Sequence, residues 1–151
     1  MKTVKVVGSL MAAAVLTVMG VGVYALAGGY DVAADRTHWP ATQRLLAYVR
    51  DSAVARRARS LAVPDLADPA MIRTGAAHYQ AMCVDCHLAP GLGATELSAG
   101  LNPRPPDFAP GIATSAQNAR PPAEQFWIIK HGIRMSGMPA WGNTHDDESL
   151  W

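Results

Sequence analysis

The residues best suited to chemistry lie at positions 83 to 87, where the sequence is Cys83-Val84-Asp85-Cys86-His87. Two cysteines three positions apart fall on one helical turn, so both thiols can add to the vinyl groups along one edge of a porphyrin. The histidine that follows can then reach the iron from one face through a neutral imidazole nitrogen. The C-x-x-C-H motif therefore predicts one covalently bound haem c with His87 as an iron ligand.

Two other uses of a cysteine pair stay open at this point. A dithiol of the thioredoxin type would be expected within a β-α-β pattern, and none is visible around the motif. A structural zinc ion would need a second pair of ligands at metal spacing, and the chain has only these two cysteines. Haem staining after denaturing electrophoresis excludes both alternatives if it is positive.

A second iron ligand is expected farther along the chain. Methionine sulfur is soft and polarizable, and it ligates haem iron in electron-transfer cytochromes. Met138 lies between Gly137, which lets the backbone approach the haem, and Pro139, which stiffens the loop that presents the sulfur. Met135 and His131 are rival ligands, for which packing and a position at a helix C-terminus are the respective structural explanations.

With these residues the sequence resembles the class I c-type cytochromes, particularly small membrane-anchored bacterial proteins with a single haem. The resemblance covers roughly residues 68–151. It rests on the C-x-x-C-H motif, on a Gly-Met-Pro-Ala-Trp segment and on the helix before the motif. It implies an all-α cytochrome c-like domain in which Cys83 and Cys86 carry the haem, His87 is the proximal ligand and Met138 is the distal ligand.

Further residues are expected close to the haem. In relatives, a proline carbonyl after the motif accepts a hydrogen bond from the second nitrogen of the proximal histidine, and Pro90 is the candidate here. Arg104, in the proline-rich stretch 103–108, is a candidate for pairing with a haem propionate. The alternative for Pro90 is a proline that only shapes a turn, and the alternative for Arg104 is an ordinary surface arginine. Gly75 and Tyr79 lie in the helix expected before the C-x-x-C-H motif. In relatives, a glycine and an aromatic residue at such positions let this helix cross the C-terminal helix closely.

The elements that must position this site begin with an apolar N-terminal segment. An uncharged run of 22 residues, 6–27, follows Lys2 and Lys5. A membrane span needs about 20 residues, whereas the apolar part of a signal peptide has about 7–15. The length favours an uncleaved anchor over residues 1–27, although Ala25-Leu26-Ala27 has the form of a signal-peptide cleavage site. The lysines predict a cytoplasmic N-terminus and a haem domain on the periplasmic side of the bacterial inner membrane.

Residues 28–67 are expected to form a juxtamembrane segment and a basic linker helix. The pattern predicts this helix over residues 37–62, with Pro40 in its first turn. Six arginines lie between positions 36 and 59. Two interpretations stay open: a docking helix for anionic lipid or a partner subunit, and a solvated spacer with ordinary surface arginines.

The haem domain is expected over residues 68–151. Asp68 and Pro69 predict the cap and the first residue of a helix that ends near residue 82. Residues 88–112 are rich in glycine and proline and predict mostly loop. Another helix is expected from Pro121 to about His131, with the following glycine as its cap.

The C-terminal helix of the relatives is expected to be mostly missing. A last helix can start at residues 143–148, but the few residues that follow make about one turn, which is too short to be stable alone. The expectation is that the sequence is an incomplete copy of the natural chain, or that another polypeptide covers the face of Gly75 and Tyr79.

Length and charge limit the function further. The chain has 151 residues and a net charge of +1, which indicates one domain with attachments and gives no case for nucleic-acid binding. The predicted function is one-electron transfer between membrane or periplasmic redox partners of a respiratory chain, without enzyme activity of its own. The alternatives are an accessory or structural subunit of a larger membrane oxidoreductase complex, and a haem peroxidase or sensor in which Met138 leaves the iron.

Overall fold

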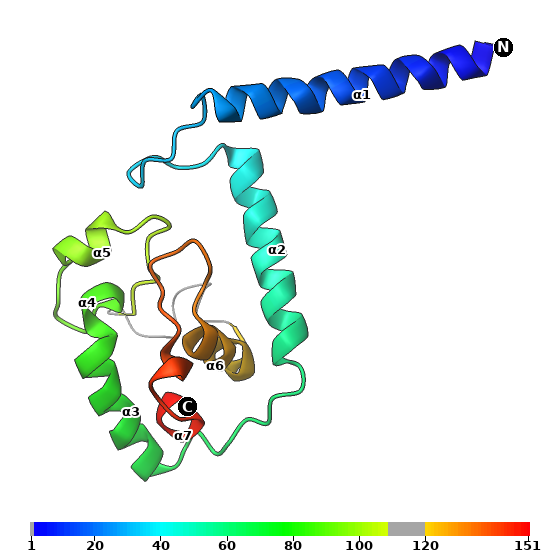
Figure 1. Ribbon diagram of the computed structural model, residues 1–151. Helices are drawn as coiled ribbons and strands as arrows, with labels where there is room; N and C mark the ends of the chain where they lie inside the picture. Colours follow the sequence, from blue (N-terminus) through cyan, green and yellow to red (C-terminus); the bar gives the residue numbers. More distant parts are fainter. Residues whose placement is uncertain (1, 109–119) are drawn as a thin grey trace. The chain divides into compact units, whose positions relative to one another are not determined.

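The computed structural model describes residues 2–108 and 120–151. Across these residues the chain is all-helical, which confirms the predicted fold class, and it divides into two compact units, Met1–Arg36 and Thr37–Trp151 (Figure 1). The first unit contains α1 (Lys2–Leu26). The elements of the second unit are α2 (Pro40–Ala58), α3 (Pro69–Met82), α4 (Val84–His87), α5 (Glu96–Gly100), α6 (Pro122–His131), the 3-10 helix η3 (Trp141–Asn143) and α7 (Asp147–Leu150).

Helix α1 fits the predicted membrane anchor. It has 25 residues, and its most apolar window has a mean hydropathy of 2.2. At 1.5 Å per residue it is about 37 Å long, enough to cross a hydrocarbon core of about 30 Å. Among the helices of the described ranges it is the one that is long and apolar enough for this. Gly28, with a φ of 75°, follows its end.

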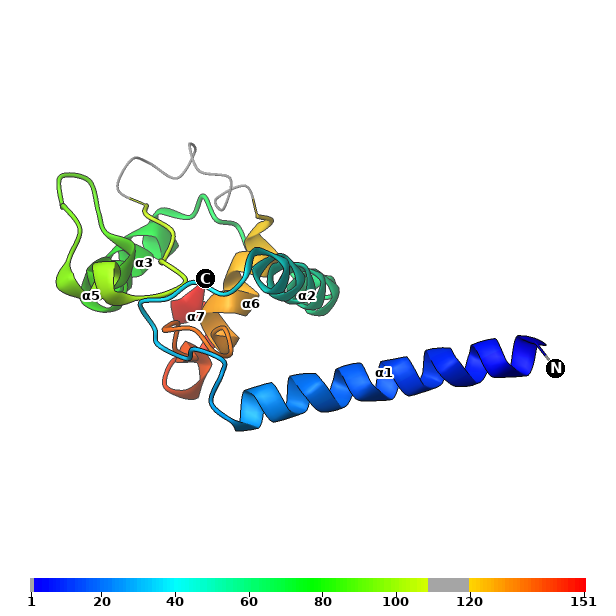
Figure 2. The same cartoon turned by 90° about the horizontal axis from the view of Figure 1, so that it is seen from above.

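Helix α2 differs from the predicted linker helix. It spans Pro40–Ala58 rather than 37–62, and it packs against α6, as both views show (Figures 1 and 2). Val54 and Ala58 face this contact and are only 1% and 3% exposed. Because α2 contributes to the core, the compact unit that contains the C-x-x-C-H motif starts at Thr37. The start of the haem domain itself at residue 68 stays a prediction.

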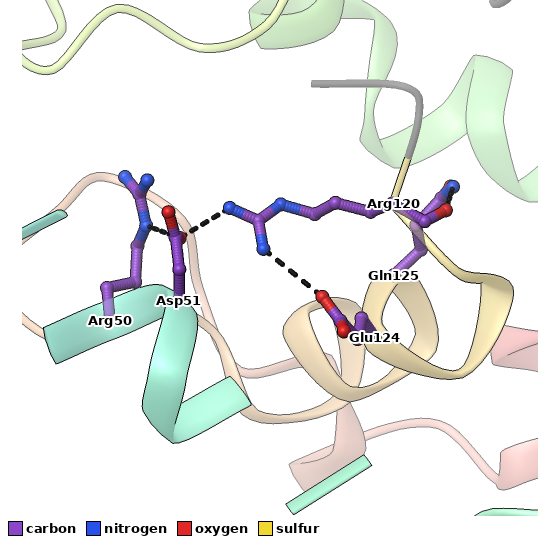
Figure 3. A network of polar contacts seen from close by, with 5 residues as sticks. All are labelled: Arg50, Asp51, Arg120, Glu124 and Gln125. Carbon is purple, nitrogen blue, oxygen red and sulfur yellow. Dashed lines mark hydrogen bonds and ion pairs between the residues drawn. The ribbon is translucent and has the colours of Figure 1, made fainter. Parts of the chain in front are cut away.

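A polar network also connects α2 with the beginning of α6 (Figure 3). Arg120 donates hydrogen bonds to the carboxylates of Asp51 on α2 and Glu124 on α6. Asp51 also accepts a bond of 2.7 Å from Arg50, and Gln125 donates to the Arg120 carbonyl. The bond from Arg50 is the main reason why the pKa of Asp51 lies below its usual value, and Arg120 lowers it further against the opposing effect of partial burial. The network therefore holds an ionised Asp51 between the two helices.

Helices α3 and α7 complete the unit. Asp68 caps α3 as predicted, by accepting a hydrogen bond from a backbone amide of its first turn. Helix α7 is a single turn capped by Asp146, and it contacts α3 and α6. Leu150 of α7 is buried, and the Trp151 ring stacks on Phe126 of α6 with 4.1 Å between ring centroids. The chain's last residues thus take part in the core.

The close helix crossing that relatives make at the position of Gly75 is not made by the described residues. A Cβ atom added at Gly75 would meet nothing within 4 Å. The contacts between α3 and α7 therefore do not require a glycine at this position.

Helix α5 interrupts the predicted loop 88–112. Its N-terminus is a capping box: the Thr95 hydroxyl accepts from the Ser98 amide, and the Ser98 hydroxyl accepts from the Thr95 amide. The usual sequence signature has glutamate or glutamine at the second position of this pair, which is why the pattern did not indicate a helix here. Residues 109–112 of the predicted loop lie outside the described ranges.

Candidate functional site

The C-x-x-C-H motif lies at the junction of α3 and α4. Cys83 directly follows α3 and caps its end, and the single turn of α4 contains Cys86 and His87. The amides of both Cys86 and His87 donate to the Cys83 carbonyl, at 3.2 and 2.8 Å. The three side chains are half-buried. Two thiols and one imidazole are thus presented from one helical turn.

The ring of His87 is oriented by two neighbours. Its Nδ1 lies 2.9 Å from the carbonyl oxygen of Pro106. A carbonyl only accepts, so Nδ1 is the donor of this bond, and in the corresponding tautomer of the neutral ring Nε2 is the nitrogen that can bind a metal. Phe108 stacks on the imidazole, with 4.9 Å between centroids and 8° between planes, and its amide donates to the His87 carbonyl. The segment 103–108 therefore sets the tautomer and the orientation of this ring.

The expectation for Pro90 is corrected by this geometry. Helix α4 ends at His87 and is capped by Leu88, whose φ is 60°, and Pro90 lies exposed beyond this turn. The carbonyl that meets His87 comes from Pro106, 19 residues after the histidine. Proximity in sequence suggested Pro90, but the chain returns to the ring only after α5.

Tyr79 has a role at this turn that the sequence did not indicate. Its hydroxyl donates to the Leu88 carbonyl at 2.5 Å, which ties α3 to the residue directly after His87. Burial, with smaller effects of Cys83 and Asp107, raises the pKa of Tyr79 to about 12, so the hydroxyl keeps its proton. No local pattern distinguishes this tyrosine from an ordinary core residue.

Arg104 is one of the residues that line a pocket beside the motif. The pocket is lined by residues of α4, of the loop before α5 and of the segment that orients His87, including Cys86, Leu88 and Arg104. The arginine side chain is exposed. The structure thus brings Arg104 close to the second cysteine, and its pairing with a propionate stays a prediction.

The loop after α6 presents the predicted distal ligand. Helix α6 is capped by Gly132, whose φ is 65°, and a Cβ atom at this glycine would lie 2.7 Å from the Met138 carbonyl oxygen. The loop can pass this close only because residue 132 is glycine. The Met138 carbonyl accepts from the Ile133 amide at 3.4 Å, and the Met138 amide donates to the Ser136 hydroxyl at 3.2 Å. The backbone of Met138 is therefore tied to the end of α6.

The rival ligands are more exposed than Met138. Met135 is 87% exposed, with a φ of 60°, whereas Met138 is half-buried. His131 is exposed, and its ring lies against Trp127 with 4.8 Å between centroids. A sulfur that binds iron inside a domain must be shielded from solvent, so exposure favours Met138.

The chemistry of the two thiols and the imidazole fits haem better than a thioredoxin-type dithiol or a zinc site. Burial raises the pKa of the Cys83 thiol, and Cys86 raises it further, whereas a redox-active dithiol needs a lowered pKa. In the part of the chain that the structure describes, no group of three or more His, Cys, Asp and Glu residues could hold a metal ion. Two thiols followed directly by an imidazole whose Nε2 is free are the groups that covalent haem attachment uses.

A comparison with known protein families places this region in context. Residues 70–151, more than half of the chain, match the family described as cytochrome c oxidase, cbb3-type, subunit III. The matched range includes the C-x-x-C-H turn, the segment that orients His87 and the loop of Met138. Searches among curated proteins and among solved structures find no significant match.

Proposed function

Since the chain belongs to the family of cytochrome c oxidase, cbb3-type, subunit III, we propose that it passes single electrons to or within a membrane respiratory complex. Family membership confirms the predicted c-type cytochrome, which binds haem c covalently and transfers electrons through its iron. The apolar helix α1 fits an anchor for such a protein. The finer parts of the proposal concern the iron ligands, the partners and the orientation in the membrane.

In this proposal Cys83 and Cys86 form the two thioether bonds, and His87 and Met138 are the axial ligands. Haem c, when bound, supplies the one-electron couple of its iron. The observation that carries the assignment of His87 as an iron ligand is the hydrogen bond from its Nδ1 to the Pro106 carbonyl. This bond leaves Nε2 as the nitrogen that can bind the iron. A filled sixth position would distinguish this protein from a peroxidase, which needs an open one.

The chain's other groups would support the ligands. The Pro106 carbonyl makes His87 a stronger donor and fixes its ring, and Phe108 shields one face of the ring from water. Gly132 lets the loop of Met138 pack on the end of α6. Arg104 is the proposed partner of a propionate.

The proposed partners are membrane or periplasmic redox proteins. Lys2 and Lys5 precede the apolar part of α1, which favours a cytoplasmic N-terminus. The haem domain would then lie in the periplasm, attached to the bacterial inner membrane, where it can meet an electron donor and a membrane oxidase.

Substitution of two methionines in one loop tests the axial ligand. Met138→Ala should abolish six-coordinate low-spin haem, remove the weak charge-transfer band of the iron–methionine bond and lower the reduction potential. Met135→Ala is the matched control, since this methionine is three residues away and exposed, and its spectrum should equal that of the native protein. Loss of the band in Met135→Ala alone would contradict the assignment. A native protein without the band would favour a peroxidase or sensor.

Electron flow through a reconstituted membrane complex tests the proposed activity. Flow should require the haem-loaded protein and should fall in Met138→Ala. Equal flow with a haem-free chain would instead identify a structural subunit.

A further inference from the structure

Helix α2 has a buried face and an exposed apolar face on opposite sides. Val54 and Ala58 are packed against α6. Leu45 and Val49 each lie nine residues before one of them, which is two and a half helical turns, so they project from the opposite side. Leu45 is 61% exposed and Val49 is 53% exposed. Four exposed residues form the outer face of α2: Leu45, Leu46, Tyr48 and Val49.

Positive charge is concentrated on the same helix. Helix α2 contains four arginines and one carboxylate, and two more arginines flank it at positions 36 and 59, whereas residues 60–151 contain five cations and nine carboxylates. Arg44 and Arg56 are exposed. Arg44 lies one turn before Tyr48, and Arg56 lies two turns after Val49, so both border the outer face. Apolar side chains bordered by arginines are typical of helices that lie on anionic membrane surfaces.

The chain itself keeps α2 within reach of a bilayer. Helix α1 ends at Leu26 and α2 begins at Pro40, so 13 residues connect them. A fully extended chain of this length spans at most about 45 Å. With α1 anchored, this connection limits how far α2 can move from the membrane and so gives a high effective concentration, and a weak intrinsic affinity of the outer face is enough for docking.

We infer that the outer face of α2 docks on the anionic lipid surface of the bilayer that α1 anchors to. Leu45 and Val49 would enter the boundary between headgroups and acyl chains, and the Tyr48 hydroxyl would stay at the level of the headgroups. The arginines at the border would pair with lipid phosphates. Lipid is favoured over a protein partner because the anchor guarantees its presence and because the excess charge of α2 is positive. The inference does not depend on which residues bind the haem iron.

Cysteine reactivity in the full-length holoprotein tests the docking. Val49→Cys places a thiol on the outer face, and Arg73→Cys places a control thiol at an exposed position of α3. Each protein is inserted as one copy per nanodisc, in phosphatidylcholine or in an equal mixture with phosphatidylglycerol. The measurement is the rate of reaction with a neutral, water-soluble poly(ethylene glycol)-maleimide. Intact mass verifies that α1 is retained, and the native chain shows the background from Cys83 and Cys86.

The outer-face thiol is expected to react several-fold more slowly in the mixed nanodiscs than in phosphatidylcholine. The control thiol should react at the same rate in both. Replacing Arg44 and Arg56 by alanine should reduce the ratio of docked to free α2 by about five-fold for each arginine. Arg44 and Arg56 are exposed, so the variants should fold normally. An unchanged haem spectrum verifies this.

Three results would overturn the inference. The first is an equal rate at position 49 in both lipid compositions, whether fast or slow. The second is protection that survives removal of both arginines. The third is protection that appears only with two copies per nanodisc or after addition of a respiratory complex, which would assign the outer face to a protein contact.

Discussion

At the scale of single residues, the backbone around the motif decides what the side chains can do. The Pro106 carbonyl selects the tautomer of His87, and the left-handed backbone of Gly132 allows the Met138 carbonyl to approach the end of α6. Neither effect comes from a reactive side chain. The site is therefore sensitive to substitutions that leave the two cysteines and the two proposed iron ligands in place.

Two glycine-to-alanine substitutions should have opposite effects on stability. Gly132→Ala should cost at least about 1–2 kcal/mol, because φ is 65° there and the new Cβ would press on the Met138 carbonyl. The iron–methionine band should also weaken in Gly132→Ala. Gly75→Ala should gain roughly 0.5–1 kcal/mol, because the glycine lies inside α3 with open space around its Cα. Urea unfolding followed by haem absorbance measures both.

The two variants control for each other, since each adds one methyl group. An unchanged Met band in Gly132→Ala would contradict the tight approach of the loop. A loss of stability in Gly75→Ala would show that another element approaches this glycine in the native protein, as the family resemblance implies.

At the scale of elements, α2 belongs to the packing of the second unit. Its inner side supplies Val54 and Ala58 to the core, and Asp51 is held by Arg50 of α2 and by Arg120, which precedes α6 (Figure 3). Ion pairs this exposed contribute little, about 0–1 kcal/mol. The buried apolar contact is therefore expected to be the main attachment of α2 to α6.

Two valines of α2 test this attachment. Val54→Ala should destabilise the protein by roughly 2 kcal/mol, because it removes buried methyl groups and leaves a cavity. Val49→Ala makes the same chemical change on the exposed side and should cost less than about 0.5 kcal/mol in detergent. The midpoint of denaturant unfolding measures the difference. Equal effects would mean that α2 does not pack on α6 in solution.

At the scale of the whole molecule, the apolar core of the described residues is small. The buried hydrophobic residues are Val54, Ala58, Val84, Leu88, Phe126 and Leu150. A domain with so few buried side chains depends on other sources of stability, and a covalent cofactor supplies apolar contact and a cross-link.

Loss of haem attachment should therefore prevent stable folding. The double variant Cys83→Ala and Cys86→Ala should give little compact protein, as judged by yield and by thermal unfolding in circular dichroism. Arg73→Ala, at an exposed position of α3, should give a normal yield. A compact, haem-free double variant in normal yield would contradict this dependence.

The sequence alone predicted features that depend on residues close together in the chain. The C-x-x-C-H turn, the cap of α3 at Asp68, the end of α6 at Gly132 and the apolar helix α1 all follow from local spacing, and the structure has each of them. The choice of haem as the cofactor also follows from a local motif, and the family match confirms it. The capping box of α5 is local too, but its serine pair departs from the usual signature.

Only the tertiary structure decided which distant residues meet. His87 bonds to Pro106, 19 residues away, rather than to the nearer Pro90, and Asp51 pairs with Arg120 across 69 residues. The packing of α2 on α6, and with it the separation of a buried and an outer face, has the same origin. A helical period shows that a helix has faces, but it carries no information about which surface elsewhere in the chain will cover each of them. That depends on how loops return the chain, and loop paths leave no periodic trace in the sequence.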